Sequence, residues 1–339
     1  KKSTILLAIV SFVAFTATAQ IQRNTLLEVF TSSTCGPCAP GNAQMASVLP
    51  SISNYTIVKY QQNFPAPGDP YQTTQAVNRR SFYGINSIPR MEIDGMWDKN
   101  AQSFNAADFN LINSVPTNVE IQLSKAFYNP ADSTVSVDVL LMPDADNANN
   151  YLRVLCAVIE NNTTGNVGSN GETIFHQVFM KFIPSESGEL LSGGFTNGTN
   201  ITKTLTGDIS DTYIEQINDL KVVVWVEDFS TKTILNSQWV DLVDQTVYQG
   251  VDEVSSMNNL KIYPNPFKSN ATIAFSMTET TNMAISIKDI TGKVVQSIDN
   301  KNYAVGNHFI EIDGNNLPGG FYLVNMISDK GVSTRKIVL

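Results

Sequence analysis

Two cysteines three positions apart, Cys35 and Cys38, are the residues of this chain whose types and spacing best suit chemistry. They enclose a Gly-Pro pair and follow an apolar run, residues 25–30, that is typical of a buried strand. Residues 39–49 can continue as a helix, so both cysteines would lie on one face of its first turn. There they can close and reopen a disulfide, and the positive end of the helix favours the thiolate that attacks disulfides. The pattern indicates thiol–disulfide exchange.

The surroundings of the two cysteines resemble the thioredoxin fold over residues 24–115. Thioredoxin-like proteins carry a cis-proline loop after the motif, preceded by a residue that contacts the substrate. Ile88 and Pro89 match this loop and precede a second short strand, so the resemblance implies that they bind substrate. Residues 55–60 are typical of the next central strand, and Lys59 falls where thioredoxins have a buried lysine.

The chain departs from this family at the strand before the motif. The resemblance implies a buried acid there that moves protons for the second cysteine, but the aligned residue is Val29. Glu28 is adjacent, and strand alternation would point it to the opposite face. Glu28 and Lys59 are therefore the candidates for a proton relay. Thr34 also stands where many relatives have Trp.

The first twenty residues predict export. Lys1 and Lys2 form a basic start, residues 5–15 are apolar, and residues 17–19 are a small-residue cleavage site, so residues 1–19 read as a signal peptide. The apolar run is shorter than a membrane span needs, and no later segment is long and apolar enough. The formal net charge is −9, and it becomes −11 without the two lysines. Such an acidic surface argues against nucleic acid and anionic lipid as partners.

The pattern changes after the first domain, which we predict for residues 20–116. Asn105 can cap a last short helix that ends before Pro116. Strict alternation at residues 134–139 and turn-rich connections then favour an antiparallel β-sandwich over residues 117–243, with Trp225 and Trp239 as core candidates. Residues 244–259 are polar and read as a linker.

Residues 260–339 contain several short strands, and Thr291 and Gly292 predict a hairpin between two of them. The order and spacing of four segments closely resemble the C-terminal sorting domain of the bacterial type IX secretion system. These segments are residues 263–267, 289–295, 317–322 and 336–339. The resemblance implies passage through the periplasm to the outer-membrane surface or the extracellular space. It also implies two partners, the secretion machinery and a surface sortase that removes the domain. The alternative is an ordinary Ig-like module.

The first two domains together resemble exported proteins related to the twenty-eight-kilodalton outer membrane protein. The matching segments are residues 27–31, 83–85, 175–178 and 220–226. This resemblance implies a thioredoxin-like domain followed by a β-sandwich. With residues 260–339 added, the predicted fold class is an α/β thioredoxin-like N-terminal domain followed by two all-β Ig-like sandwich domains. The family's biochemical role is poorly defined, so the resemblance implies an architecture and little mechanism.

Two functions remain open at this point. In the first, Cys35 attacks a substrate disulfide and Cys38 resolves the mixed disulfide, so protein thiols and disulfides are the substrates. In the second, the disulfide is a structural staple, and the sandwich makes the chain a surface binding or adhesion protein. Cys156 lies in an apolar strand and most simply packs as a small hydrophobe, with a second redox role as the alternative.

We expect no cofactor and no metal. A structural zinc site usually needs four ligands, and the chain has two histidines, His176 and His308, both far from residue 35 in sequence. We expect His176 to cap or pack within the sandwich. Two histidines also support no Ser-His-Asp arrangement, and the chain lacks a phosphate-binding glycine-rich loop.

Overall fold

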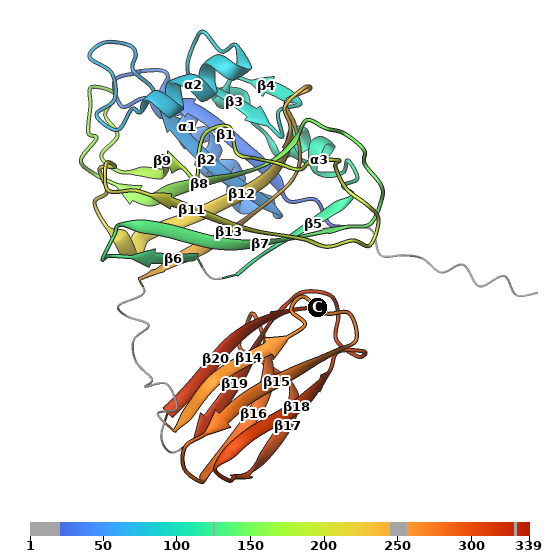
Figure 1. Cartoon of the computed structure of the whole chain (residues 1–339). Helices are drawn as coiled ribbons and strands as arrows, with labels where there is room; N and C mark the ends of the chain where they lie inside the picture. Colours follow the sequence, from blue (N-terminus) through green and yellow to red (C-terminus); the bar gives the residue numbers. More distant parts are fainter. Residues whose placement is uncertain (1–20, 125, 245–255, 329–330) are drawn as a thin grey trace, which may run out of the picture.

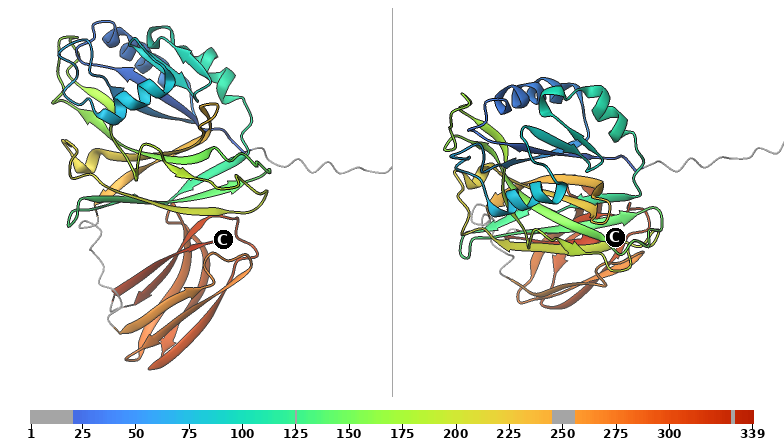
Figure 2. Two further views of the ribbon diagram at one scale, coloured as in Figure 1. Left: turned by 45° about the horizontal axis from the view of Figure 1, so that its top comes forward. Right: turned by 90° about the horizontal axis from the view of Figure 1, so that it is seen from above.

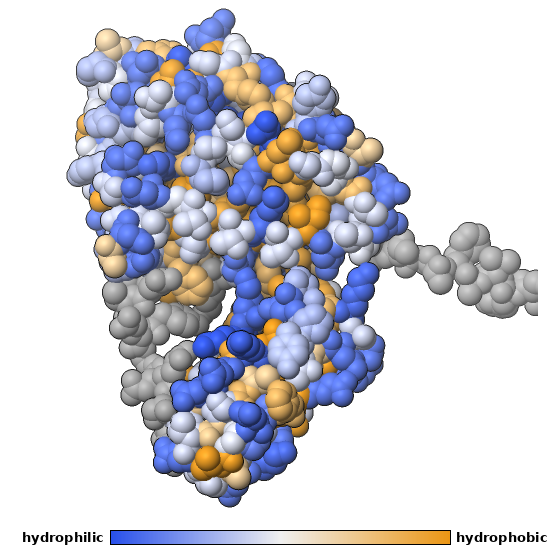
Figure 3. All heavy atoms as spheres, viewed as in Figure 1, coloured by the Kyte–Doolittle hydropathy of each residue, from blue (hydrophilic) through white to orange (hydrophobic). Residues whose placement is uncertain are grey.

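A computed structural model gives the fold of residues 21–124, 126–244, 256–328 and 331–339. The predicted signal peptide lies outside the described residues, as does most of the predicted linker. Figure 1 shows an upper body that contains the helices and the longest sheet, and a separate all-β unit below it. Hydrophilic side chains cover much of the visible face of both parts (Figure 3), which suits an acidic exported chain.

The N-terminal part is an α/β unit in which helices cover a four-stranded portion of the sheet. β1 pairs in parallel with β2 and antiparallel with β3, and β4 lies at the edge. Its elements are β1 (Thr25–Thr31), α1 (Cys38–Val48), β2 (Tyr55–Gln61), α2 (Thr74–Tyr83), β3 (Arg90–Ile93), β4 (Trp97–Lys99) and α3 (Ala106–Asn113), with short 3₁₀ turns at Leu49–Ser51 and Ala101–Ser103.

Capping residues fix the ends of the two later helices. The side chain of Asn105 accepts a hydrogen bond from the backbone N–H of Asp108, so the predicted cap of α3 is confirmed. Thr73 caps α2 in the same way. Gly84 ends α2 with a φ of +78°, a left-handed conformation that glycine adopts at little cost.

The two faces of this sheet have separate cores because successive side chains of a strand point to opposite sides. Leu27, Val29 and Ile57 face α1 and α3, where they pack with Met45 and Phe109. The alternate residues of β1 and β2, among them Leu26, Phe30 and Tyr60, pack in a second cluster. That cluster also contains Trp225 and other residues from beyond position 150.

The predicted middle domain continues the same sheet. β9 pairs in parallel with β2 at one position, Val178 opposite Lys59, and the strand order runs β9-β2-β1-β3-β4 across the junction. The sheet is therefore continuous across the predicted boundary at residue 116, and one core cluster contains residues from both sides of it. The strands are β5 (Val119–Leu123), β6 (Ala126–Asn129), β7 (Thr134–Pro143), β8 (Leu152–Thr163), β9 (Phe175–Phe182), β10 (Glu189–Leu190), β11 (Ile201–Asp208), β12 (Leu220–Asp228) and β13 (Thr233–Asp244), with a 3₁₀ turn at Ile217–Asp219.

The core of the middle part lies between β8, β12 and the layer formed by β5, β7 and β11. Val154, Val158 and Val224 are fully buried in it. Trp225 is fully buried on the opposite face of β12, which confirms it as a core residue, whereas Trp239 is partly buried. Cys156 is a free, fully buried thiol in this core, as its apolar strand predicts.

The C-terminal unit is a sandwich of a three-stranded sheet, β14-β15-β18, and a four-stranded sheet, β17-β16-β19-β20. Its predicted hairpin is confirmed, because the N–H of Gly292, at a φ of +87°, donates to the carbonyl of Asp289. β14 begins inside the predicted linker. The strands are β14 (Met257–Tyr263), β15 (Asn270–Met277), β16 (Thr281–Asp289), β17 (Val294–Tyr303), β18 (Gly306–Asp313), β19 (Phe321–Ser328) and β20 (Gly331–Val338).

The C-terminal unit touches the outer layer of the middle part (Figure 2). Leu140 packs against Phe321 and Val338, and all three are buried. Lys336 forms an ion pair with Asp138 beside them. The contact is a small apolar cluster with a charged edge.

Candidate active site

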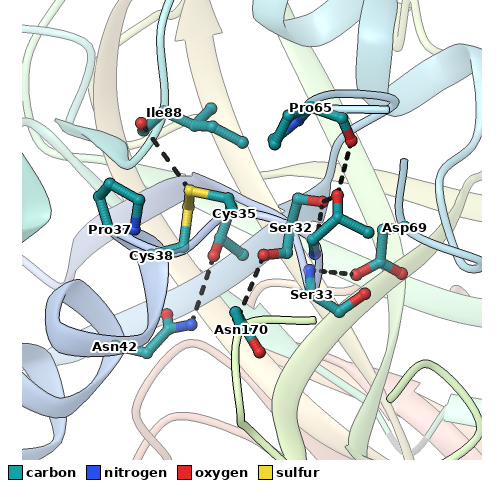
Figure 4. The surroundings of a disulfide bond; sticks show 12 residues. Ser32, Ser33, Cys35, Pro37, Cys38, Asn42, Pro65, Asp69, Ile88 and Asn170 are labelled. Atoms are coloured by element: carbon teal, nitrogen blue, oxygen red, sulfur yellow. Dashed lines mark hydrogen bonds between the residues drawn. A yellow bond between two sulfur atoms is a disulfide. The ribbon is translucent and has the colours of Figure 1, made fainter. Parts of the chain in front are cut away.

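The two cysteines lie where β1 ends and α1 begins, and they form a disulfide (Figure 4). The backbone N–H of Cys35 donates to the carbonyl of Ser32, and that of Cys38 donates to the carbonyl of Cys35. These bonds wind the chain into the first turn of the helix, where Gly36 and Pro37 are exposed. Cys35 is 2% exposed and Cys38 is fully buried, so the turn presents its backbone to solvent more than its sulfur atoms.

The predicted proline loop lies against the disulfide. The Ile88–Pro89 bond is cis, and the carbonyl oxygen of Ile88 is 3.9 Å from Sγ of Cys35 (Figure 4). Pro89 approaches α1 at Gly41, where an added Cβ would lie 3.1 Å from Cγ of Pro89. Gly41 thus provides the space for this approach, a role that the sequence pattern did not single out.

Two loops hold the segment that leads into the motif. The hydroxyl of Thr34 donates to the carbonyl of Pro65, and the N–H of Ser33 donates to the carboxylate of Asp69 at 2.8 Å. From the middle part, the N–H of Asn170 donates to the carbonyl of Ser33 at 2.9 Å. The β8–β9 connection therefore contributes to the wall of the site. Sequence reasoning missed this because residue 170 is distant in the chain and carries no motif.

Lys59 lies on the same sheet face as the helix that carries Cys38. It pairs with Val29, the residue in place of the expected acid, so the lysine is adjacent to the position where that acid would stand. Lys59 is 6% exposed, and burial lowers its pKa to about 8, an effect that the nearby charge of Glu172 opposes. Glu172 comes from the β8–β9 connection and accepts hydrogen bonds from Asn42, one helical turn after Cys38.

Glu28 faces the other side of the sheet, as alternation predicts. Its carboxylate accepts two hydrogen bonds from Arg79, at 2.7 and 2.8 Å, and further bonds from the hydroxyls of Tyr60 and Tyr83. Arg79 also donates to Glu227 of β12, at 2.8 Å and 3.1 Å. The structure therefore places Glu28 in a buried ionic network between α2 and the middle part, not beside Lys59.

This network was not found from the sequence. Its members lie 51 and 148 residues apart, and each residue type is ordinary in its own element. Burial raises the pKa of Glu227, while Arg79 opposes that rise. One cation between two buried carboxylates, with tyrosine and tryptophan donors around them, is an arrangement that fixes two elements relative to each other.

The described residues show no cluster of three or more His, Cys, Asp or Glu side chains that could hold a metal ion. His176 is exposed, not packed in the sandwich core, and its Nδ1 lies 2.8 Å from Oδ1 of Asn162. In the same described ranges, no helix has the length and apolar character of a membrane span.

Comparison with known families identifies the C-terminal unit. Residues 261–339 match the secretion system C-terminal sorting domain. The predicted type IX sorting domain is confirmed, and the chain is exported to the outer-membrane surface or the extracellular space. Such a domain also implies an interaction with the type IX secretion machinery.

Solved structures give the fold class of the whole chain. HBP35 of Porphyromonas gingivalis matches with a TM-score of 0.54 and 15% identity, covering 95% of this chain and 100% of that chain. A domain of the outer membrane lipoprotein Omp28 from the same organism is 16% identical over 38% of this chain and 90% of its own, with a TM-score of 0.26. No curated protein matches the chain in sequence. The predicted fold class is confirmed.

Proposed function

We propose that this exported protein carries out thiol–disulfide exchange through Cys35 and Cys38. One observation carries the proposal: the disulfide lies at a strand-to-helix junction with the carbonyl of Ile88 against Sγ of Cys35. In the reduced form that carbonyl can accept a hydrogen bond from the thiol, and a substrate sulfur would approach from the same side. The substrates are protein thiols and disulfides.

The exchange balances without a further reactant. The reduced protein attacks a substrate disulfide through the Cys35 thiolate, which forms a mixed disulfide and releases one substrate thiolate. The Cys38 thiolate then attacks Sγ of Cys35, which releases the second substrate thiolate and restores the disulfide. Two electrons pass from the protein to the substrate. In the reverse direction the Cys35–Cys38 disulfide takes two electrons from a substrate dithiol.

The neighbouring residues have roles that follow from their positions. Backbone groups at Ile88 and Pro89 would hold an extended substrate segment as an added strand. Lys59, whose pKa burial lowers to about 8, would exchange a proton near neutral pH on the Cys38 side of the sheet. Glu28 is occupied by Arg79 on the other face, so in this proposal its role is to hold the fold, and the proton relay rests on Lys59.

The sorting domain completes the proposal. After outer-membrane passage a surface sortase would remove the C-terminal unit, leaving a protein that is released or attached to the surface. The redox pair would then face an oxidising environment. The reduction potential of the pair relative to that of its surroundings sets the direction of electron transfer.

A second candidate function is surface binding with the disulfide as a structural staple. The burial of Cys35, at 2% exposed, favours this candidate, because an attacking sulfur has to reach its substrate. The apolar Val29 in place of an acid also favours it. In this reading the β-strands beyond residue 117 carry the function.

The two candidates differ in the reduction potential of the disulfide. The chain from residue 20 onward would be equilibrated with glutathione or dithiothreitol buffers and its thiols counted. A potential of roughly −120 to −270 mV, the range of thioredoxin-like catalysts, with faster alkylation at Cys35 than at Cys38, supports exchange. A potential below about −300 mV, or thiols that stay unreactive until denaturation, supports the staple.

A trapping experiment tests the roles of the two cysteines. In a Cys156→Ser background, Cys38→Ser should accumulate a mixed disulfide with a disulfide-bonded protein substrate, because the resolving thiol is missing. The matched Cys35→Ser variant should accumulate none. Equal accumulation by both variants would contradict the assignment of Cys35 as the nucleophile.

A further inference from the structure

A pocket of about 350 Å³ lies on the other side of α1 from the proline loop. It is bounded by the outer stripe of α1, by the end of β2 and by the segment that leads into β9. Neither cysteine lines it, but Lys59, to which we assign the proton relay of the exchange reaction, does. Its volume falls within the range of small-molecule sites.

The floor of the pocket contains a buried amide without a partner. Gln61 is 1% exposed, and neither its oxygen nor its nitrogen has a hydrogen-bond partner among the described residues. Burying an amide without a hydrogen-bond partner is unfavourable, because the group gives up its hydrogen bonds to water and gains none in the protein. Gln61 therefore offers both a donor and an acceptor to whatever occupies the pocket.

Next to Gln61 the floor carries a positive charge. Lys59 is 6% exposed, and no described residue forms a hydrogen bond or a salt bridge with its ammonium group. The charge of Glu172 acts on this group without a direct ion pair. A buried charge is most stable with a direct partner, and a bound anion would supply one.

Glu172 lies at the same pocket but its carboxylate is already hydrogen-bonded elsewhere. It accepts from Nδ2 of Asn42 at 3.0 and 3.1 Å and from Nδ2 of Asn170 at 2.6 Å. Its charge nevertheless disfavours a second negative charge on the occupant. The polar groups thus select a monoanion over a dianion such as phosphate.

Much of the wall of the pocket is apolar, although Asn42, His176 and Gln177 also line it. Ala39, Ala43 and Ala46 follow one another along α1 at helical spacing, and Ile174 and Phe175 face the pocket from the other side. Ile174 is 49% exposed, so apolar surface continues to the rim. These walls suit a short aliphatic chain, which would bury apolar surface between the helix and β9.

We propose that this pocket binds a small organic monocarboxylate with a short branched aliphatic chain. The carboxylate lies against Lys59 and the amide N–H of Gln61, and the chain lies along the alanines of α1. Two sources share this chemistry: a free short-chain acid, and the C-terminal carboxylate of a peptide whose last residue is aliphatic. The site does not depend on the redox activity of the cysteines.

Titration calorimetry on the chain from residue 20 onward tests the proposal with three probes. 4-Methylpentanoate should bind with a dissociation constant in the millimolar range or tighter. Its neutral analogue 4-methylpentanamide should bind at least about thirtyfold more weakly, since it leaves the buried charge without a partner. N-Acetyl-leucine mimics a peptide terminus: tighter binding than 4-methylpentanoate assigns the peptide source, and weaker binding assigns the free acid.

Two variants and one control locate the binding. Lys59→Met should weaken 4-methylpentanoate by about thirtyfold or more. Ala43→Leu fills the apolar wall without touching the polar floor and should abolish binding, whereas Ser47→Leu adds the same side chain on α1 outside the pocket and should leave binding unchanged. The Ala43 variant keeps the test decisive if Lys59→Met does not fold.

Three results would overturn the proposal. The first is that neither carboxylate binds at concentrations up to about 20 mM, because a ligand of this size that fits the pocket should bind more tightly than that. The second is equal binding of the amide and the acid. The third is unchanged binding by a folded Ala43→Leu variant.

Discussion

Glu92 should make the stability of the N-terminal unit depend on pH. It lies in β3 opposite Glu28 on one side and opposite Asp98 on the other, and it is 5% exposed. Burial, with the charges of Asp98 and Glu28, raises its pKa from 4.5 to about 7, while Arg90 and Lys232 oppose the rise. The folded protein therefore holds a proton on Glu92 at pH values where the unfolded chain has lost it.

The direction and the size of this pH dependence follow from the difference between the pKa of Glu92 in the folded and in the unfolded protein. Between pH 4.5 and about 7 the folded state binds more protons than the unfolded state, so the free energy of unfolding falls as the pH rises. At 1.36 kcal/mol per pKa unit the full loss is about 3 kcal/mol. It is complete above pH 7 to 8, where Glu92 has to be charged in the folded protein.

Glu92→Gln removes the ionisation and keeps the shape of the side chain. Relative to the native protein, the variant should gain about 3 kcal/mol of unfolding free energy between pH 4.5 and pH 8, because it avoids the charged form. Glu120→Gln, a substitution of an exposed glutamate, is the matched control and should show no such change.

Urea unfolding followed by tryptophan fluorescence measures this difference. The three tryptophans are Trp97, Trp225 and Trp239, and the C-terminal unit contains none, so the signal follows the body that contains Glu92. Stability profiles of the native protein and Glu92→Gln that stay parallel from pH 4.5 to pH 8, within about 0.5 kcal/mol, would refute the reasoning.

The remaining predictions concern three buried groups. Arg79→Met should lower the unfolding free energy by about 3 to 5 kcal/mol in the same fluorescence assay, because it leaves Glu28 and Glu227 buried without their cation; a loss under about 1 kcal/mol would mean that water replaces the arginine. Gln61→Leu should raise the unfolding free energy by about 1 to 2 kcal/mol in the absence of ligand, since it removes an unpaired buried amide; a destabilised variant would show that ordered water already satisfies it. Cys156 is fully buried and burial raises its pKa, so the unreduced protein should show no thiol reactive toward a disulfide reagent until it unfolds, and one afterwards; reaction of the native protein would contradict this.

Patterns within short stretches of the sequence were enough to predict much of the fold. The strand at residues 25–30, the helix after Cys38 and the cap at Asn105 depend on short-range rules of periodicity and hydrogen bonding, and the structure has all three. The sorting domain is predicted by its resemblance to a known family, whose characteristic segments occur in the same order and at the same spacing in this chain.

The sequence did not predict how the two upper parts join. The pairing of β9 with β2 at Val178 and Lys59 makes one sheet out of two predicted domains. A single parallel bridge between strands more than a hundred residues apart leaves no local signal. The contact of Asn170 with Ser33 and the ionic network of Arg79 depend on this joining, so they could not be predicted either.

The sequence by itself determined the chemistry available to this protein: a cysteine pair at a helix start, a proline loop after it, and a C-terminal export label. Each is written in neighbouring residues. Only the tertiary structure decided the setting of that chemistry, because burial and charge pairing depend on which distant segments meet. It buried Cys35, turned Glu28 toward Arg79, and placed Lys59 beside Gln61 in a pocket that the middle strands complete.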